Sequence, residues 1–190
     1  MRTMHVKDAI QTRRSYRAIE ACEVTDELIT TLATAAQLMP SCFNKQPWRY
    51  GFIYEAEQLK RVKDEALAEG NQLWAKPSSL IIVIYSAKDL DCVIGDREYY
   101  LFDTGLATGA MLLRATELGL VVHPIAGYDP VKVREITGIP EKYNVIALVI
   151  VGKKAESITE SFPERLIESE QHRPSRTPIE DFSFRNRFIS

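Results

Sequence analysis

Three arginines stand within five residues near the start of the chain, in the segment Arg13-Arg14-Ser15-Tyr16-Arg17. Guanidinium groups this close repel one another unless an anion or carboxylates lie between them. Their planar donor forks match phosphate oxygens in pairs, and the serine adds a hydroxyl and a backbone donor. The segment is therefore a candidate phosphate site. The alternative is a solvated basic turn whose arginines pair with carbonyls of the preceding helix.

A second candidate is the proline-bounded segment 40–48, which reads Pro-Ser-Cys-Phe-Asn-Lys-Gln-Pro-Trp. Asn44 and Gln46 each carry both a donor and an acceptor. That combination suits a planar ligand edge on which C=O and N–H alternate, such as a pyrimidine or an isoalloxazine. The prolines stiffen the loop and Trp48 anchors it. The alternative is a capped turn that leads into a strand.

Two further segments carry weaker signals. In His123-Pro124-Ile125-Ala126-Gly127-Tyr128 a strand ends in a turn, and Gly127 would let backbone N–H groups approach a ligand closely. The stretch His172-Arg173-Pro174-Ser175-Arg176-Thr177-Pro178 is basic. The alternatives are an ordinary strand-to-helix turn and a solvated linker.

Other kinds of site find little support. The sequence has no GxGxxG, Walker A, HExxH or GxSxG motif. The histidines are scattered without metal-ligand spacing, so no metal is expected. A nucleophile pair of Cys42 and His123 stays open, although a lone thiol and a lone histidine are more often structural. Cys22, Cys42 and Cys92 are odd in number and far apart, which argues against a disulfide framework and favours reduced thiols in the cytoplasm.

Composition limits the remaining classes. The chain has 190 residues, a formal net charge of −2, 45% hydrophobic residues and 26% charged residues. These values are typical of globular domains and exclude a disordered, collagen-like or coiled-coil chain. The charge argues against bulk binding to nucleic acid or to an anionic membrane surface. No apolar run approaches the ~20 residues of a spanning helix, and residues 1–10 lack an apolar signal core. We expect one domain over residues 1–190.

Strands and helices alternate along the chain, which predicts an α/β or α+β sheet covered on both faces. Thr25 is the expected N-cap of a helix that Pro40 stops. A continuous apolar run at 79–85 predicts a buried strand, and Gly119 is expected to end the most apolar helix. The helices are expected at Val6–Thr12, 26–39, Glu57–Leu67 (ending near Gly70), Phe102–Leu118 and Val131–Thr137, and the strands at Trp48–Tyr54, Ser79–Tyr85, Val121–Ile125 and Val145–Val151.

The last segment, Lys153–Ser190, differs from the rest. It is polar, has no clear periodicity and carries isolated phenylalanines at 162, 182, 184 and 188. A tail of this length is either disordered or an arm whose aromatic side chains dock on another surface. The spaced phenylalanines favour an arm, and a symmetric partner subunit is the simplest surface for it.

Taken together and in this order, the four segments resemble the nitroreductase family of flavin enzymes. The segment Pro-Ser-x-x-Asn-x-Gln-Pro-Trp at 40–48 is the specific part of the resemblance. Weaker parts extend it over nearly the whole chain: the Arg-Arg-Ser-x-Arg start, the small-residue helix that contains Asp103, Leu118-Gly119-Leu120, the turn at Gly138–Pro140, and the ending Arg176-Thr177-Pro178-Ile179-Glu180-Asp181-Phe182.

The resemblance implies an α+β fold with a central, mostly antiparallel sheet flanked by helices, in an entwined homodimer that exchanges C-terminal arms. Two tightly bound FMN molecules would lie at the subunit interface, each contacted by both chains. Carried over by position, Arg13, Ser15 and Arg176 would hold the phosphate, with Arg14 alongside, and Arg173 is also counted among the cofactor-binding residues.

For the flavin ring, the resemblance implies that Arg17 reaches N1 and O2, while Gly127 brings its N–H close to N5. Gln72 or Asn71 would hydrogen-bond the ring edge. Four loop residues would come from the partner chain, and four consecutive residues would pass near the dimethylbenzene and central rings. These two sets are Pro40, Ser41, Cys42 and Asn44, and Pro124, Ile125, Ala126 and Gly127.

The implied chemistry belongs mostly to the cofactor. NAD(P)H would pass a hydride to N5, leave, and be replaced by a nitroaromatic, quinone or similar planar acceptor in a ping-pong cycle. Arg17 would stabilise charge on the reduced ring, and no protein nucleophile is needed. Several nitro- and quinone-reducing members carry Glu where this chain has Ala126, so the acceptor class stays open. A reductive dehalogenase, a flavin-modifying enzyme and a non-catalytic flavin- or phosphometabolite-binding protein are the alternatives.

Overall fold

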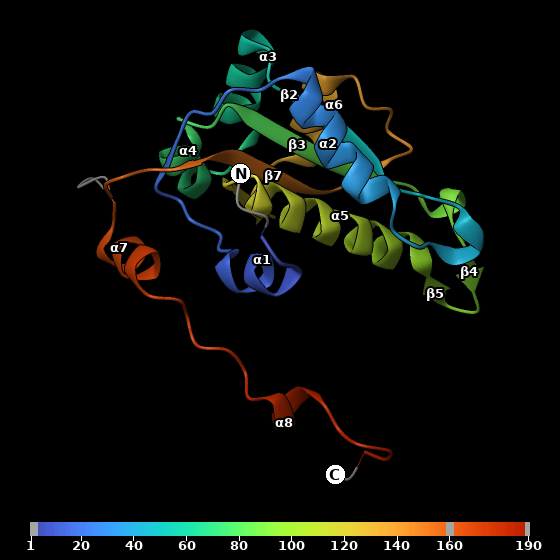
Figure 1. Cartoon of the computed structure of the whole chain (residues 1–190). Coiled ribbons are helices and arrows are strands. Elements are labelled where there is room, and N and C mark those ends of the chain that lie inside the picture. Colours follow the sequence, from blue (N-terminus) through green and yellow to red (C-terminus); the bar gives the residue numbers. More distant parts are fainter. Residues whose placement is uncertain (1–3, 159–161, 189–190) are drawn as a thin grey trace.

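The computed structural model describes residues 4–158 and 162–188. Its centre is a five-stranded sheet in which every pair of neighbouring strands is antiparallel (Figure 1). The long strand β7 pairs with β3, β6 and β1, and β2 pairs with β3. The strands are β1 (Ile19–Glu20), β2 (Arg49–Ile53), β3 (Leu80–Ser86), β6 (Leu120–Ile125) and β7 (Asn144–Lys154), beside a separate hairpin of β4 (Val93–Ile94) and β5 (Arg97–Glu98).

Helices cover both faces of this sheet, because the central strands are apolar on both sides. In β3, Leu80 and Ile82 face the cluster that contains α2 and α5, while Ile81 and Val83 face α3, α4 and α6. The helices are α1 (Val6–Thr12), α2 (Asp26–Gln37), α3 (Ala56–Arg61), α4 (Glu69–Ala75), α5 (Tyr99–Glu117), α6 (Pro130–Thr137), α7 (Glu164–Gln171) and α8 (Ile179–Phe182), with short turns η1 (Cys42–Asn44), η2 (Val62–Ala66) and η3 (Lys88–Leu90). The expected α+β class is confirmed.

Local signals placed several helix ends correctly. The Thr25 Oγ1 accepts a hydrogen bond from the Leu28 N–H at 3.1 Å, as expected of the N-cap of α2. After α5 the chain turns at Gly119, whose φ of 78° is a conformation that glycine adopts without strain. No helix among residues 4–158 and 162–188 is long and apolar enough to cross a bilayer.

Two local predictions were wrong. The helix expected over Glu57–Leu67 divides into α3 and the wider turn η2, because the Leu67 N–H bonds to the Val62 carbonyl five residues back. Gly70 does not end a helix but lies inside α4. Burial of the Trp74 side chain, which is 2% exposed, outweighs the ~1 kcal/mol that glycine costs in a helix.

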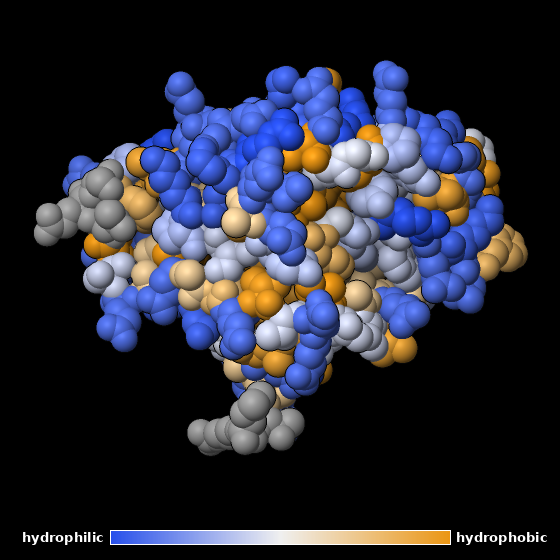
Figure 2. Space-filling view, turned by 90° about the horizontal axis from the view of Figure 1, so that it is seen from above, coloured by the Kyte–Doolittle hydropathy of each residue, from blue (hydrophilic) through white to orange (hydrophobic). Residues whose placement is uncertain are grey.

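The tail is partly ordered against the body. The helix α7, which was not predicted, buries its Glu170. Beyond it, residues 171–188 are exposed and the chain runs away from the sheet to α8 (Figure 1). Residues 159–161 and 189–190 of the expected arm, and residues 1–3, lie outside the described residues. Seen from above, the molecular surface is mostly hydrophilic with hydrophobic patches near the middle (Figure 2).

Candidate functional site

Arginines from the two ends of the chain meet in one cavity. It has a volume of about 210 Å³ and lies between the connector after α1 and the segment after α7. The structure thus brings together all the residues predicted to hold a phosphate, although about 160 residues separate the two segments. The lining residues are Arg13, Arg14, Ser15, Arg17, Ser169, Arg173, Pro174 and Arg176.

Two of these arginines join the segments that form the cavity. The Arg14 Nη2 donates to the carbonyl oxygens of Ser169 and His172, at 2.7 and 2.9 Å. The Arg173 Nη2 donates in the opposite direction, to the carbonyl oxygens of Gln11 and Arg13. These two side chains therefore fasten the tail to the connector, which neither alternative described, since Arg14 bonds to the tail rather than to the preceding helix and Arg173 is not simply solvated. Within residues 4–158 and 162–188, Arg13, Arg17 and Arg176 make no comparable contacts.

A buried carboxylate fixes the same junction. The Glu170 carboxylate accepts hydrogen bonds from the backbone N–H groups of Arg17 at 2.7 Å and Ala18 at 3.2 Å. Hydrogen bonds to a charged acceptor are stronger than neutral ones. Glu170 therefore holds the connector where it enters β1. Sequence reasoning missed this residue, since its partners lie 153 and 152 residues away.

The electrostatics of the cavity favour an anion. Burial lowers the pKa of the Arg13 guanidinium, and the nearby Arg173 and Arg176 charges lower it further. Within the described part of the chain, none of the five cavity arginines forms an ion pair with a carboxylate. A phosphate, with several acceptor oxygens, would relieve this repulsion and use the unpaired donors.

A stack of rings continues from the cavity toward the sheet. The Arg17 guanidinium lies 5.9 Å from the centre of a Trp74 ring, and the His123 ring stacks on Trp74 with ring centres 4.6 Å apart. The His123 Nδ1–H donates to the Tyr16 carbonyl at 3.1 Å. Burial lowers the pKa of His123 to about 4, with the Arg17 and Arg13 charges adding to the effect. His123 is thus a neutral structural group. Its contacts are with Tyr16 and Trp74 and not with Cys42, so His123 and Cys42 do not form a nucleophile pair.

Beyond Trp74 lies the turn that contains Gly127. The Trp74 Nε1–H donates to the Asn71 Oδ1 at 3.3 Å, and the Asn71 Nδ2 donates to the Gly127 carbonyl at 2.9 Å. A Cβ on Gly127 would lie 2.6 Å from that Nδ2, so only glycine fits without a shift. Among the described residues nothing accepts a hydrogen bond from the Gly127 N–H. That donor is available to a ligand.

Some residues around this turn are free to contact a ligand, and others are occupied by contacts within the fold. Pro124 and Ile125 end β6, and Ala126 is exposed beside Gly127. The Gln72 Nε2 is already occupied by the carbonyl oxygens of Asp64 and Leu67, at 3.1 and 2.7 Å. Of the two amides considered for the ring edge, Asn71 is the one that lies beside Gly127. Sequence reasoning did not identify Trp74 as a site residue, because its role depends on contacts with Arg17 and His123, which are distant in sequence.

The loop residues lie elsewhere in the molecule. The Cys42 N–H donates to the Asp103 Oδ2 at 2.7 Å, so the loop sits at the start of α5. Arg13 and Arg14 share a second cavity with Thr116, at the end of α5. Thr116 lies thirteen positions after Asp103 in the helix, a rise of about 20 Å. Pro40, Ser41, Cys42 and Asn44 therefore do not join the arginine cavity within one chain.

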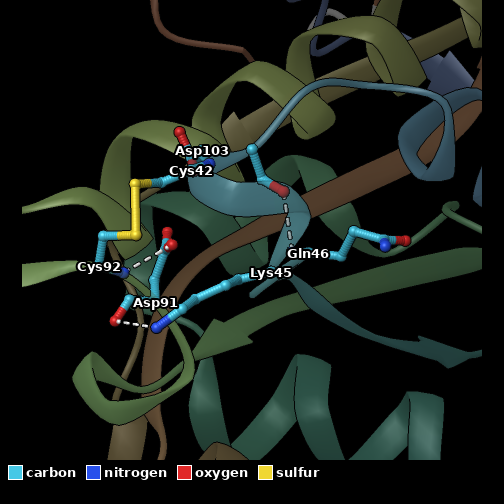
Figure 3. The surroundings of a disulfide bond; sticks show 7 residues. Cys42, Lys45, Gln46, Asp91, Cys92 and Asp103 are labelled. Carbon is cyan, nitrogen blue, oxygen red and sulfur yellow. Dashed lines mark hydrogen bonds between the residues drawn. A yellow bond between two sulfur atoms is a disulfide. The ribbon is translucent and has the colours of Figure 1, made fainter.

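The cysteines correct one expectation. Cys42 and Cys92 form a disulfide across 50 residues, so only Cys22 is a free thiol (Figure 3). The prediction of reduced thiols at all three positions was wrong, because contacts of the loop with the segment before β4 bring the two cysteines together. Neither spacing nor number signalled this.

The sequence also matches known proteins. The family model described as the nitroreductase family matches residues 10–89 and 58–153. This chain belongs to the nitroreductase family. A relative from Archaeoglobus fulgidus, named "Putative NADH dehydrogenase/NAD(P)H nitroreductase", is 32% identical over 149 residues, which are 75% of this chain and 82% of the relative. A relative from Thermus thermophilus, named NADH dehydrogenase, is 25% identical over 88% of this chain and 94% of its own length.

Solved structures of this family share the fold. One, an oxidoreductase containing FMN, superposes with a TM-score of 0.83 and 28% identity, and the match covers 100% of this chain and 96% of that one. A nitroreductase family protein from Clostridium difficile matches with a TM-score of 0.76 and 24% identity over 97% of this chain and 99% of its own. The nitroreductase fold therefore extends over the chain, tail included.

Proposed function

We propose that this chain is an FMN-dependent NAD(P)H oxidoreductase that reduces nitroaromatics, quinones or similar planar acceptors. The observation that carries the proposal is the arginine cavity, which joins a segment near each end of the chain and in which no described carboxylate pairs with an arginine. A phosphomonoester fits this donor set. The similarity to nitroreductases, among them the structure of an oxidoreductase containing FMN, supports FMN as the molecule that carries this phosphate.

The residues divide the work of holding this cofactor. Arg13, Ser15 and Arg176 bind the phosphate, while Arg14 and Arg173 hold the cavity together. Arg17, fixed through Glu170 and lying over Trp74, supplies a positive charge toward the pyrimidine side. The unused N–H of Gly127 donates to the central ring. When bound, FMN supplies the acceptance and return of a hydride, and NAD(P)H and the acceptor use one site in turn.

A homodimer is part of the proposal, with FMN at the subunit interface. One chain holds its arginine cavity and its loop at opposite ends of α5, about 20 Å apart. A second copy that lies antiparallel to the first would bring its Pro40–Asn44 loop to the cavity. The exposed arm, with Phe182, Phe184 and Phe188 each more than 60% exposed, would pack on that copy. The domain then spans residues 1–190, with 153–190 as the exchanged arm.

The acceptor is the open part of the proposal. Ala126 is exposed and places no carboxylate beside Gly127, which favours broad acceptance of planar molecules over one charged substrate. Neither nucleic acid nor a membrane surface is a partner, given the net charge of −2. A cytoplasmic location, where NAD(P)H is available, completes the proposal.

The test begins with the purified protein and added FMN. We expect a yellow protein whose flavin is bleached by NADH or NADPH in the absence of oxygen and recovers colour with a quinone or nitroaromatic. A colourless protein that takes up no FMN contradicts the proposal. Bound flavin that neither nicotinamide reduces would favour a flavin-binding protein, and recovery with halogenated aromatics alone a dehalogenase.

A further inference from the structure

The Cys42–Cys92 disulfide has no task in the proposed function. It joins η1, in the loop after α2, to the residue before β4, and its Cα atoms lie 6.1 Å apart (Figure 3). Cys42 is half-buried and Cys92 is 7% exposed. Cys42 is therefore the more exposed residue of the two.

A buried acid stands beside the two sulfurs. The Asp91 side chain is 5% exposed, and its carboxylate lies within 4.8 Å of both Sγ atoms. Its Oδ1 accepts the Cys92 N–H at 2.7 Å, whereas its Oδ2 has no hydrogen-bond partner among the described residues. Buried polar atoms without a partner are rare in native proteins. The Asp91 side chain is drawn beside the disulfide in Figure 3.

The surroundings favour a proton on this carboxyl. Burial raises the pKa of Asp91, and the neighbouring Asp103 raises it further through its charge and through a hydrogen bond between the two carboxyl groups, against the opposing effects of the Cys92 N–H and of Lys45. Asp103 is itself 3% exposed and accepts the Cys42 N–H. A protonated Asp91 would share its O–H with the Asp103 carboxylate, which keeps a proton beside the two sulfurs.

We propose that Cys42 and Cys92 are a redox-active pair that a dithiol reduces, and that Asp91 is the acid that protonates the departing Cys92 sulfur. Beyond this chemistry, the pair controls the loop that carries Ser41, Cys42 and Asn44.

The electrons and protons balance as follows. A thiolate of the dithiol attacks the Cys42 Sγ, the Cys42–Cys92 bond breaks, and a mixed disulfide forms at Cys42. The Cys92 sulfur leaves with the electron pair and takes the proton of Asp91. The second thiol of the reductant gives its proton to Asp91 and attacks the mixed disulfide, and the released Cys42 thiolate takes a proton from water. The pair gains two electrons and two protons, and the dithiol becomes a cyclic disulfide.

Reduction would loosen a strained loop. Phe43, Asn44 and Gln46 have φ values of 47°, 56° and 49°, a region that non-glycine residues adopt at a cost. Besides the disulfide, the loop is held by the bond from Cys42 to Asp103 and by the Ser41 Oγ, which accepts the Gln46 N–H at 2.9 Å. The effect on flavin rests on the proposed function, which places this loop on the ring. Release of one strained residue corresponds to about tenfold weaker FMN binding by the reduced protein.

The pair itself is tested without flavin. The full-length protein is treated with oxidised glutathione, alkylated and digested, and a peptide linked through Cys42 and Cys92 is expected by mass spectrometry. Dithiothreitol added to the native protein should abolish that peptide and expose both thiols to alkylation. The C22S variant, which lacks the free thiol, should behave identically. The proposal fails if no linked peptide forms or if the native protein resists the dithiol.

The role of Asp91 is tested by the rate of reduction. We expect D91N to be reduced by dithiothreitol about tenfold more slowly than the native protein, in the low range of acid catalysis. The conservative D91E should recover much of the rate, and D89N, which alters an exposed acid two residues away, should leave it unchanged. If Asp91 were merely a nearby negative charge, its removal would speed thiolate departure. Equal or faster reduction of D91N therefore overturns the assignment.

The link to the cofactor has its own measurement. FMN affinity is compared between the oxidised and reduced forms of the native protein, and between these and the C42S variant. Equal affinities overturn control of the loop. A protein that forms the pair but binds no FMN refutes the proposed function and leaves the redox pair standing, so the two failures are distinguishable.

Discussion

Replacing Arg13 by alanine separates the phosphate contact from the architecture of the cavity. Its guanidinium bonds only weakly within the chain, to the Ser15 Oγ at 3.3 Å. It also lies among the charges of Arg173 and Arg176, which lower its pKa. The lost hydrogen bond and the relieved repulsion oppose each other. We therefore expect R13A to change the free energy of unfolding of the FMN-free protein by no more than about 1 kcal/mol.

The effect on FMN binding should be larger. A hydrogen bond between charged partners contributes about 1.5–3 kcal/mol, so its loss raises the Kd for FMN by roughly one to two decades. FMN at 100 times the native Kd stabilises the native protein by about 2.7 kcal/mol. At the same FMN concentration, the stabilisation of R13A falls to about 1.4 kcal/mol for a tenfold loss and about 0.4 kcal/mol for a hundredfold loss.

The assay is urea unfolding of native and R13A protein, each without ligand, with FMN and with riboflavin. Riboflavin lacks the phosphate and should stabilise both proteins equally. R134A is the matched control, since Arg134 lies on α6 and does not line the cavity. Unchanged FMN stabilisation in R13A refutes the phosphate assignment. An equal loss with riboflavin would instead mean that Arg13 acts through the shape of the site.

Three further results are expected. Because the pKa of His123 in the folded protein, about 4, lies below its ordinary value of 6.5, the unfolded state binds a proton first as the pH falls. The free energy of unfolding of the native protein should therefore drop by up to about 3 kcal/mol between pH 6.5 and 4, as measured by urea unfolding at a series of pH values. The same drop in the H123Q variant would contradict this. In the G127A variant the new Cβ must displace the Asn71 amide, so we expect a loss of about 1 kcal/mol in the free energy of unfolding and slower flavin reduction in stopped-flow measurements. The control variant G70A, which has open space around its Cβ, should show neither the loss of stability nor the slower reduction. Deleting residues 177–190 keeps the arginine cavity but removes the arm, so light scattering should show monomers; a dimeric truncated protein would refute the arm.

Elements defined by neighbouring residues could be predicted from the sequence. The Thr25 cap, the end of α5 at Gly119 and the continuous apolar strands β3 and β7 all depend on signals within a few residues. The short strand β1 could not be read in this way. Its two residues, Ile19 and Glu20, lie opposite Lys154 and Lys153 of β7. Only this pairing with β7 makes them a strand.

The site residues, like the elements, could be predicted only where the signal lies within a few neighbouring residues. Residue types alone marked the segment 13–17 as a candidate phosphate site and the stretch around Arg176 as basic, but the role of Arg176 and the convergence of the two segments depended on the resemblance to a family, since no spacing connects them. Glu170 and Trp74 gave no signal at all. A glutamate in a short amphipathic helix reads as a solvated residue until the backbone N–H groups of a distant connector meet it. The Cys42–Cys92 pair was hidden for the same reason, since 50 residues separate its members.

The two faces of α5 bear on the proposed dimer. One face, with Asp103, Ala107 and Met111, is buried against the sheet and α2. The opposite face exposes Leu101, Phe102 and Leu106, and a Cβ built on Gly105 or Gly109 meets nothing within 4 Å. A face made for water would carry polar side chains at these positions. Small residues between large apolar ones allow the close approach of another backbone, so the helix that separates the two half-sites also offers the surface on which a second copy would reunite them.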